Sequence, residues 1–126
     1  MHAGYLDVDA GDRHIAAIID TLRKSPQWQK MMIVVTFDEN GGWWDYVAPP
    51  KGDRWGPGTR IPAIVIPPHA RTGEVDHTIY DTGSIARFIT RRWGLEPLPG
   101  LVEREQARVN AGGPPPSDLT KALRMG

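Results

Sequence analysis

Two short apolar runs, at residues 31–37 and 60–66, constrain the fold more than any other feature of this sequence. The first run has no polar alternation, which is typical of a strand buried on both faces, as in a parallel sheet covered by helices. The second run carries Pro62 near its start, where a strand tolerates proline. A long loop at residues 40–60, rich in glycine, proline and tryptophan, separates them. Two or three strands make a poor sheet alone, so we expect the chain either to associate or to be a piece of something larger.

A helix is expected over residues 11–25. Apolar side chains recur there at spacings of three and four, which places them on one face of the helix. Asp9 or Asp12 could cap the start of this helix, and Pro26 ends it because the residue before a proline avoids the helical region. The apolar residues of the stripe are Ile15, Ile18, Ile19 and Leu22.

A second helix is expected over residues 81–93, with Asp81 as its N-terminal cap and Gly94 as a left-handed C-terminal cap. Beyond it the apolar pattern fades. The Pro/Gly-rich residues 98–126 are therefore predicted to form an extended tail, with a short helix near residues 119–123. The order of helix, strand, loop, strand and helix indicates an α/β fold.

Length, charge and composition exclude several classes of protein. The 126 residues allow one compact domain at most. The 15 basic residues balance 15 acidic ones, so we expect no nucleic-acid partner, because binding to a phosphate backbone rests on excess positive charge. Cysteine is absent, which excludes disulfides and thiolate metal sites. No apolar stretch reaches about 18 residues and the start lacks a signal-peptide pattern, so neither a membrane span nor a signal peptide is expected on this chain.

The chemistry-bearing feature is a pair of acids, Asp38 and Glu39, directly after the first apolar run. In open α/β sheets, ligands bind beyond the carboxyl ends of the strands. Two adjacent carboxylates followed by Gly41 and Gly42 suit a hard divalent cation. A solvated acidic turn explains the same spacing equally well. A metal site also needs more ligands than this segment supplies.

The residues around this pair resemble a signature of the bacterial phosphoesterase family, which lies within the alkaline phosphatase superfamily. Acid phosphatases and phosphatidylcholine-type phospholipases C belong to this family. The central stretch is 37–50, with the sequence FDENGGWWDYVAPP, and the similarity covers roughly residues 2–97. Its motifs are specific because several distinct ones recur in the same order. The other matching stretches are 11–16, 56–62, 76–81 and 84–95.

The resemblance implies a fold and an activity. The chain would be a fragment of an alkaline-phosphatase-like mixed or parallel sheet flanked by helices. Residues 1–97 would be the C-terminal part of a catalytic domain, and residues 98–126 a tail. The whole protein would be a metal-dependent phosphoesterase that hydrolyses phosphomonoesters through a Ser or Thr nucleophile upstream, and the fragment alone would be inactive. The alternatives are a phospholipase C-type phosphodiesterase fragment and a non-catalytic interaction module.

The resemblance also implies site residues. By motif, Asp38 and Glu39 would be metal ligands, and an oxygen-rich pair favours calcium, magnesium or manganese over zinc. The remaining ligands would lie upstream, so the fragment alone is not expected to hold the ion. The candidate catalytic residues are His2, as a leaving-group or phosphate-binding histidine, and His77. For His77 a structural role at the start of the second helix is at least as well supported.

Two departures from the phospholipase C pattern lean toward the acid phosphatase branch. Tyr46 stands where phospholipase C members tend to have histidine. Residues 81–84 read Asp-Thr-Gly-Ser where those members tend to have Asp-His-Thr-Ser.

Two further groups each keep two interpretations. Trp43, Trp44 and Trp55 would line a substrate mouth or pack against the missing half of the protein. Arg54 and Arg60 would bind a phosphate or neutralise nearby acids. Those acids are Asp38, Asp45 and Asp53.

The expected partners are a phosphoester substrate and the missing N-terminal portion of the same protein. Self-association through exposed sheet edges is a further expectation, because truncation would leave those edges unpaired. The family resemblance implies a periplasmic or secreted location, with any export signal on the missing segment.

Overall fold

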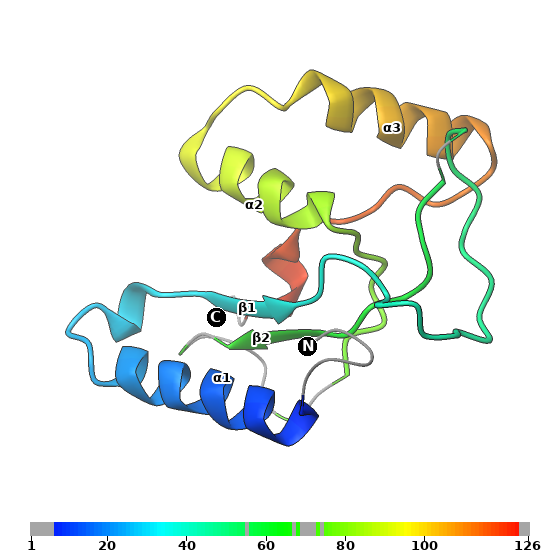
Figure 1. Cartoon of the computed structure of the whole chain (residues 1–126). Helices are drawn as coiled ribbons and strands as arrows, with labels where there is room; N and C mark the ends of the chain where they lie inside the picture. Colours follow the sequence, from blue (N-terminus) through cyan, green and yellow to red (C-terminus); the bar gives the residue numbers. More distant parts are fainter. Residues whose placement is uncertain (1–6, 55, 67, 69–72, 74, 124–126) are drawn as a thin grey trace.

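The computed structural model describes residues 7–54, 56–66, 68, 73 and 75–123, and its elements are shown in Figure 1. Three α-helices, a two-stranded sheet and two short 3-10 helices make up the described part of the chain. In the view of Figure 1, α1 lies on one side of the two strands, and α2 and α3 lie on the other. The elements are α1 (Val8–Arg23), η1 (Trp28–Lys30), β1 (Ile33–Thr36), β2 (Ala63–Ile66), α2 (Gly83–Trp93), α3 (Pro99–Asn110) and η2 (Leu119–Ala122). The combination confirms an α/β fragment.

The two strands pair antiparallel, with Ile33 opposite Ile66 and Thr36 opposite Ala63. The described residues contain no parallel pair, so the parallel arrangement predicted from the unbroken apolar run is not seen. The chain returns from β1 to β2 through the long loop without a crossover helix, and such a connection suits antiparallel neighbours. The strands are also less buried than expected, since Ala63 and Ile64 of β2 are exposed, Ile64 by 58%.

Helix α1 begins at Val8, three residues earlier than predicted, because an aspartate further upstream caps it. The Asp7 side chain accepts a hydrogen bond from the Asp9 main-chain N–H at 3.0 Å. The prediction of Asp9 or Asp12 as the cap is therefore wrong. Asp9 instead forms an ion pair with Arg13 one turn along the helix.

Helix α2 begins at Gly83, and Asp81 does not cap it in the predicted way. Thr82 occupies the cap position without a side-chain hydrogen bond, while the Asp81 carboxylate accepts a bond from Arg87 Nη1 at 2.7 Å. The C-terminal prediction is confirmed. Gly94 has φ +62°, and the Leu95 N–H donates to the Thr90 carbonyl at 2.8 Å, which satisfies a carbonyl of the last turn.

The region after α2 is not the extended tail that the fading apolar pattern predicted. It contains the 12-residue helix α3, which opens with Pro99 in its first turn and ends before Gly112, whose φ is +81°. Proline at the start and glycine past the end favour a helix, and the glutamate, arginine and glutamine between them are good helix formers. The short helix predicted near 119–123 is confirmed as η2.

The best-packed contact joins α2 to the segment that ends in η2. Ser84 is 1% exposed, and its hydroxyl donates to the Ser117 carbonyl at 2.6 Å. Leu119, at 5% exposure, is the one apolar side chain that is buried among the described residues. None of the described helices is both long and apolar enough to cross a membrane.

Candidate functional site

Asp38 and Glu39 lie just beyond the carboxyl end of β1, as predicted, and both are exposed. The Asp38 carboxylate accepts a hydrogen bond from the Glu39 main-chain N–H at 3.1 Å. The Glu39 carboxylate accepts one from the Gly41 N–H at 2.8 Å. These local bonds bend the chain immediately after the strand and hold both acids at the carboxyl end of β1.

The turn that follows depends on two glycines and one asparagine. Gly41 and Gly42 have φ values of +64° and +80°, a conformation that other residues adopt only with strain. Asn40 accepts a bond from the Gly42 N–H at 2.9 Å, and its amide donates to the Thr59 hydroxyl at 2.7 Å. Asn40 thereby ties the turn after β1 to the chain leading into β2. Asn40 belongs to the signature at residues 37–50, but nothing in the sequence alone points to its bond with Thr59.

A second connection across the loop is the ion pair between Asp45 and Arg60. Arg60 donates from Nε and Nη2 to the two carboxylate oxygens, both at 2.9 Å, and its main-chain N–H donates at 3.2 Å. Hydrogen bonding from Arg60, with a further bond from the Val47 N–H, holds the pKa of the Asp45 carboxyl well below its usual range. The Arg60 guanidinium also lies over the Tyr46 ring, 5.4 Å from its centre. Of the two interpretations of Arg60, neutralisation of an acid is the one that the structure shows.

The donor chemistry of Asp38 and Glu39 fits a hard divalent ion, because both provide carboxylate oxygens. They are two ligands and not a complete set. Within the described ranges, no group of three or more His, Cys, Asp or Glu side chains lies close enough together to hold a metal ion. These two residues can therefore serve as part of a metal site whose other ligands come from elsewhere.

Among the described residues, the predicted histidine His77 does not join the acids in such a group. His77 is exposed and lies in the turn before α2, and His2 is outside the described residues. The neighbouring Asp76 organises this turn, since its carboxylate accepts bonds from the Thr78 N–H at 2.8 Å and the Tyr80 hydroxyl at 2.6 Å. Burial, together with the Asp76 hydrogen bond, raises the pKa of Tyr80 to about 12.

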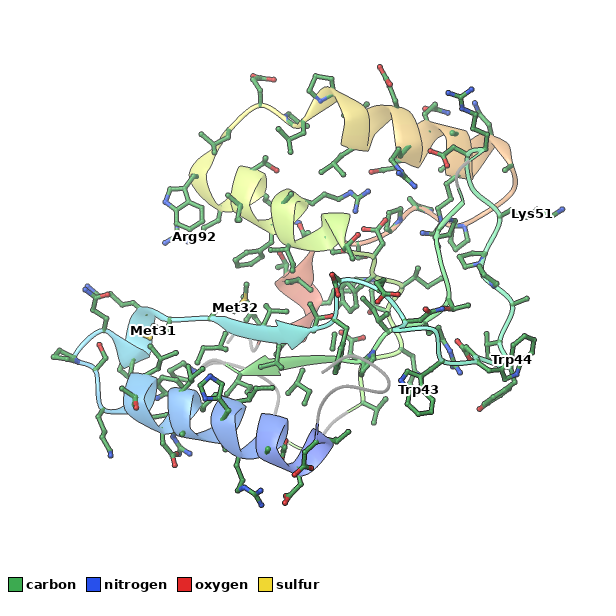
Figure 2. The ribbon with its side chains drawn as sticks, in the orientation of Figure 1. Met31, Met32, Trp43, Trp44, Lys51 and Arg92 are labelled. Carbon is green, nitrogen blue, oxygen red and sulfur yellow. The ribbon has the colours of Figure 1, made fainter. Side chains whose placement is uncertain are left out.

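Two tryptophans of the loop are open to solvent. Trp44 is 90% exposed, and Figure 2 shows Trp43 and Trp44 at the edge of the molecule, on the loop and away from both strands. Such an exposed aromatic pair is suited to contact with a ligand or with another part of a protein. Trp55, the third member of the predicted set, lies outside the described residues.

Comparison with known proteins shows similarity to several phospholipases C. Non-specific phospholipase C1 of Arabidopsis thaliana is 38% identical over 116 residues, covering 71% of this chain and 21% of the relative. Non-hemolytic phospholipase C of Pseudomonas aeruginosa is 31% identical over 117 residues, covering 68% of this chain and 17% of the relative. Phospholipase C B of Mycobacterium tuberculosis is 32% identical over 121 residues, covering 74% and 23%.

The chain thus spans about a fifth of the length of these curated relatives. No solved structure matches it. The model of the Phosphoesterase family matches residues 1–96, which include β1, β2, α2 and the Asp38–Glu39 pair. The chain belongs to the Phosphoesterase family.

Proposed function

We propose that this chain provides Asp38 and Glu39 as two ligands of a divalent metal ion in a phosphoester hydrolase. One observation carries the proposal. The two acids are exposed together at the carboxyl end of β1, in a turn that Gly41 and Gly42 make possible, within the segment that the family model matches. Their oxygen donors favour calcium, magnesium or manganese over zinc.

A divalent ion bound there would neutralise negative charge on the phosphoryl oxygens and on the attacking hydroxyl. Other residues of this chain hold and orient the two acids. The bond from Asn40 to Thr59 and the Arg60–Asp45 pair fix the two ends of the loop, so that Asp38 and Glu39 are presented from a constrained turn. We place the nucleophilic Ser or Thr and the remaining ligands in a portion of the protein that precedes this chain. The fragment alone is then expected to be inactive.

For the substrate we propose the phosphodiester bond of a phospholipid. The support is that the relatives named above are phospholipases C. Phosphomonoester hydrolysis is the second candidate. It is favoured by Tyr46, which stands where phospholipase C members tend to have histidine and which lies against Arg60 instead.

The test uses the longer protein that contains this chain, with Asp38→Asn and Glu39→Gln as variants. Each substitution removes a charged ligand while keeping the shape of the side chain. Asp20→Asn is the matched control, because Asp20 is an exposed acid on α1. Hydrolysis of phosphatidylcholine and of p-nitrophenyl phosphate would be followed with and without a chelator.

We expect each site variant to lose activity by about 100-fold or more, and we expect chelation to abolish the activity of the parent protein. Asp20→Asn should match the parent. Activity of Asp38→Asn within a few-fold of the parent would remove this residue from the metal site. A clear preference for the phosphomonoester would select the second candidate for the substrate.

A further inference from the structure

Arg108, in the last turn of α3, is a buried cation with two unpaired donor atoms among the described residues. The residue is 5% exposed, and its Nε and Nη2 atoms have no hydrogen-bond partner among the described residues. Burial of a charge without compensation is strongly unfavourable. A group that accepts hydrogen bonds from this guanidinium would therefore be bound favourably.

The Arg108 side chain lines a small pocket of about 30 Å³. Its walls come from four loop residues, from residues at the start of α2 and in the second half of α3, and from Pro116. The loop residues are Gly52, Asp53, Gly56 and Pro57. Figure 1 shows the tip of this loop beside the C-terminal end of α3. The volume exceeds the roughly 10–15 Å³ that one water requires. A small polar group fits this space, whereas a whole nucleotide or lipid does not.

The other two arginines of the pocket already have partners. Arg87 pairs with Asp81 at 2.7 Å and with Glu105 at 3.4 Å. Arg104 pairs with Asp53 at 3.4 Å and donates to the Gly56 carbonyl at 2.8 Å. These acids also limit how strongly an anion is attracted, so a weak affinity is expected. For Arg108, the described residues provide no acceptor to Nε or Nη2.

The geometry of the two unpaired donors indicates the class of ligand. Nε and Nη2 form the edge of a guanidinium that binds two oxygens of one group side by side. Arg60 uses this same pair of atoms to hold the two oxygens of Asp45, each at 2.9 Å. The same edge of Arg108 suits a phosphoryl or carboxylate group, and it does not suit a single-atom anion such as chloride in the same way.

The Arg108 side chain is also held in place. Gly112 turns the chain after α3, and a Cβ added to Gly113 would lie 2.9 Å from Arg108 Cγ and 2.9 Å from the Lys51 carbonyl oxygen. Figure 2 shows Lys51 near the C-terminal end of α3. The aliphatic part of Arg108 is thus enclosed before any ligand binds, which lowers the entropy lost on binding.

We propose that Arg108 binds a small oxyanion, a phosphoryl or carboxylate group, in the pocket between α3 and the loop residues Gly52, Asp53, Gly56 and Pro57. This site lies partly beyond residue 96, where the family match ends, and it does not depend on the metal site proposed above. A phosphoryl group could be supplied by free phosphate or by a phosphate ester, and the experiment separates the two.

The test is a titration of the full 126-residue chain followed by NMR of the arginine Nε–H resonances, with Arg108 assigned by substitution. The probes are inorganic phosphate, phosphocholine, acetate and chloride, at matched ionic strength. We expect a saturable shift of the Arg108 resonance with at least one of the oxyanions and not with chloride. A response to phosphate but not to phosphocholine would indicate a free-phosphate site. A response to both would indicate a site that accepts esters. A response to acetate alone would indicate a carboxylate site.

Two variants complete the test. Arg108→Lys keeps the charge and loses the two-donor edge, so oxyanion affinity should fall on the order of tenfold. Arg92→Lys makes the same change on an exposed part of α2 and should bind like the parent. An equal response of the Arg108 resonance to chloride, or no response to any oxyanion, would overturn the proposal. Because that resonance is observed in the parent chain, this result stands even if Arg108→Lys does not fold.

Discussion

Replacement of Ser84 by alanine should destabilise the contact that holds the C-terminal segment against α2. The Ser84 hydroxyl accepts a hydrogen bond from the Asp81 N–H at 3.0 Å and donates one to the Ser117 carbonyl at 2.6 Å. The side chain is 1% exposed, so water does not replace these bonds readily. The substitution leaves one main-chain donor and one main-chain acceptor without this partner.

An unsatisfied buried polar group costs about 1–3 kcal/mol. Alanine recovers a few tenths of a kcal/mol through its higher helix propensity. We therefore expect Ser84→Ala to lower the free energy of unfolding by about 2 kcal/mol. For a chain of this size, that corresponds to a fall in melting temperature on the order of 5–10 °C.

The measurement is urea unfolding followed by circular dichroism, with Thr21→Ala as the control. Thr21 also donates its hydroxyl to a main-chain carbonyl, that of Ala17 at 2.9 Å, but it is exposed on α1. Its loss should change the free energy of unfolding by less than about 0.5 kcal/mol. If Ser84→Ala were as mild as Thr21→Ala, the contact between α2 and the C-terminal segment would not contribute as argued here.

Two further predictions concern the loop and the end of α2. Because Arg60 lowers the pKa of Asp45 in the folded chain, the pair stabilises the fold above the ordinary aspartate pKa of about 4 and progressively less below it. The gap in urea midpoint between the parent and Asp45→Asn should therefore be widest near neutral pH and shrink as the pH falls below about 4; a gap constant from pH 7 to pH 3 would contradict this. Gly94→Ala should cost about 1–2 kcal/mol, because Gly94 has φ +62° with open space around its Cα, so the cost comes from the backbone alone. Thermal unfolding would measure this, and Gly100→Ala, at a glycine inside α3 with nothing near its Cα, should instead be neutral or stabilising.

The sequence predicted the strands well and their pairing poorly. Unbroken apolar runs locate β1 and β2, but the direction of pairing depends on which strands lie beside them. The position of helix α2 and its C-terminal end could be predicted from the sequence, since its apolar stripe and Gly94 carry this information locally. Helix α3 could not be found by periodicity, because no large apolar residue lies between Val102 and Val109 to continue a stripe. Pro99 at its start and Gly112 beyond its end were the signals available.

The residues of the candidate sites also differ in how far the sequence alone could predict them. The position of Asp38 and Glu39 follows from the end of an apolar strand, so the sequence places them correctly. The pairing of Asp45 with Arg60 was one of several pairings that the sequence left open. Arg108 gave no signal at all, because its burial depends on a loop about 50 residues away in the sequence coming back to cover it.

The hydrogen bonds of α2 bear on where this protein could be shortened. The family match ends at residue 96, and a shortened gene would naturally stop there. Yet Ser84 bonds to Ser117, Arg91 pairs with Asp118 at 2.8 Å, and Arg87 reaches Glu105. A chain cut at residue 96 would keep every matched motif, but three side chains on α2 would each lose one acceptor, although Arg87 would keep Asp81. The bounds of the family match are therefore a poor guide to the smallest fragment that would fold stably.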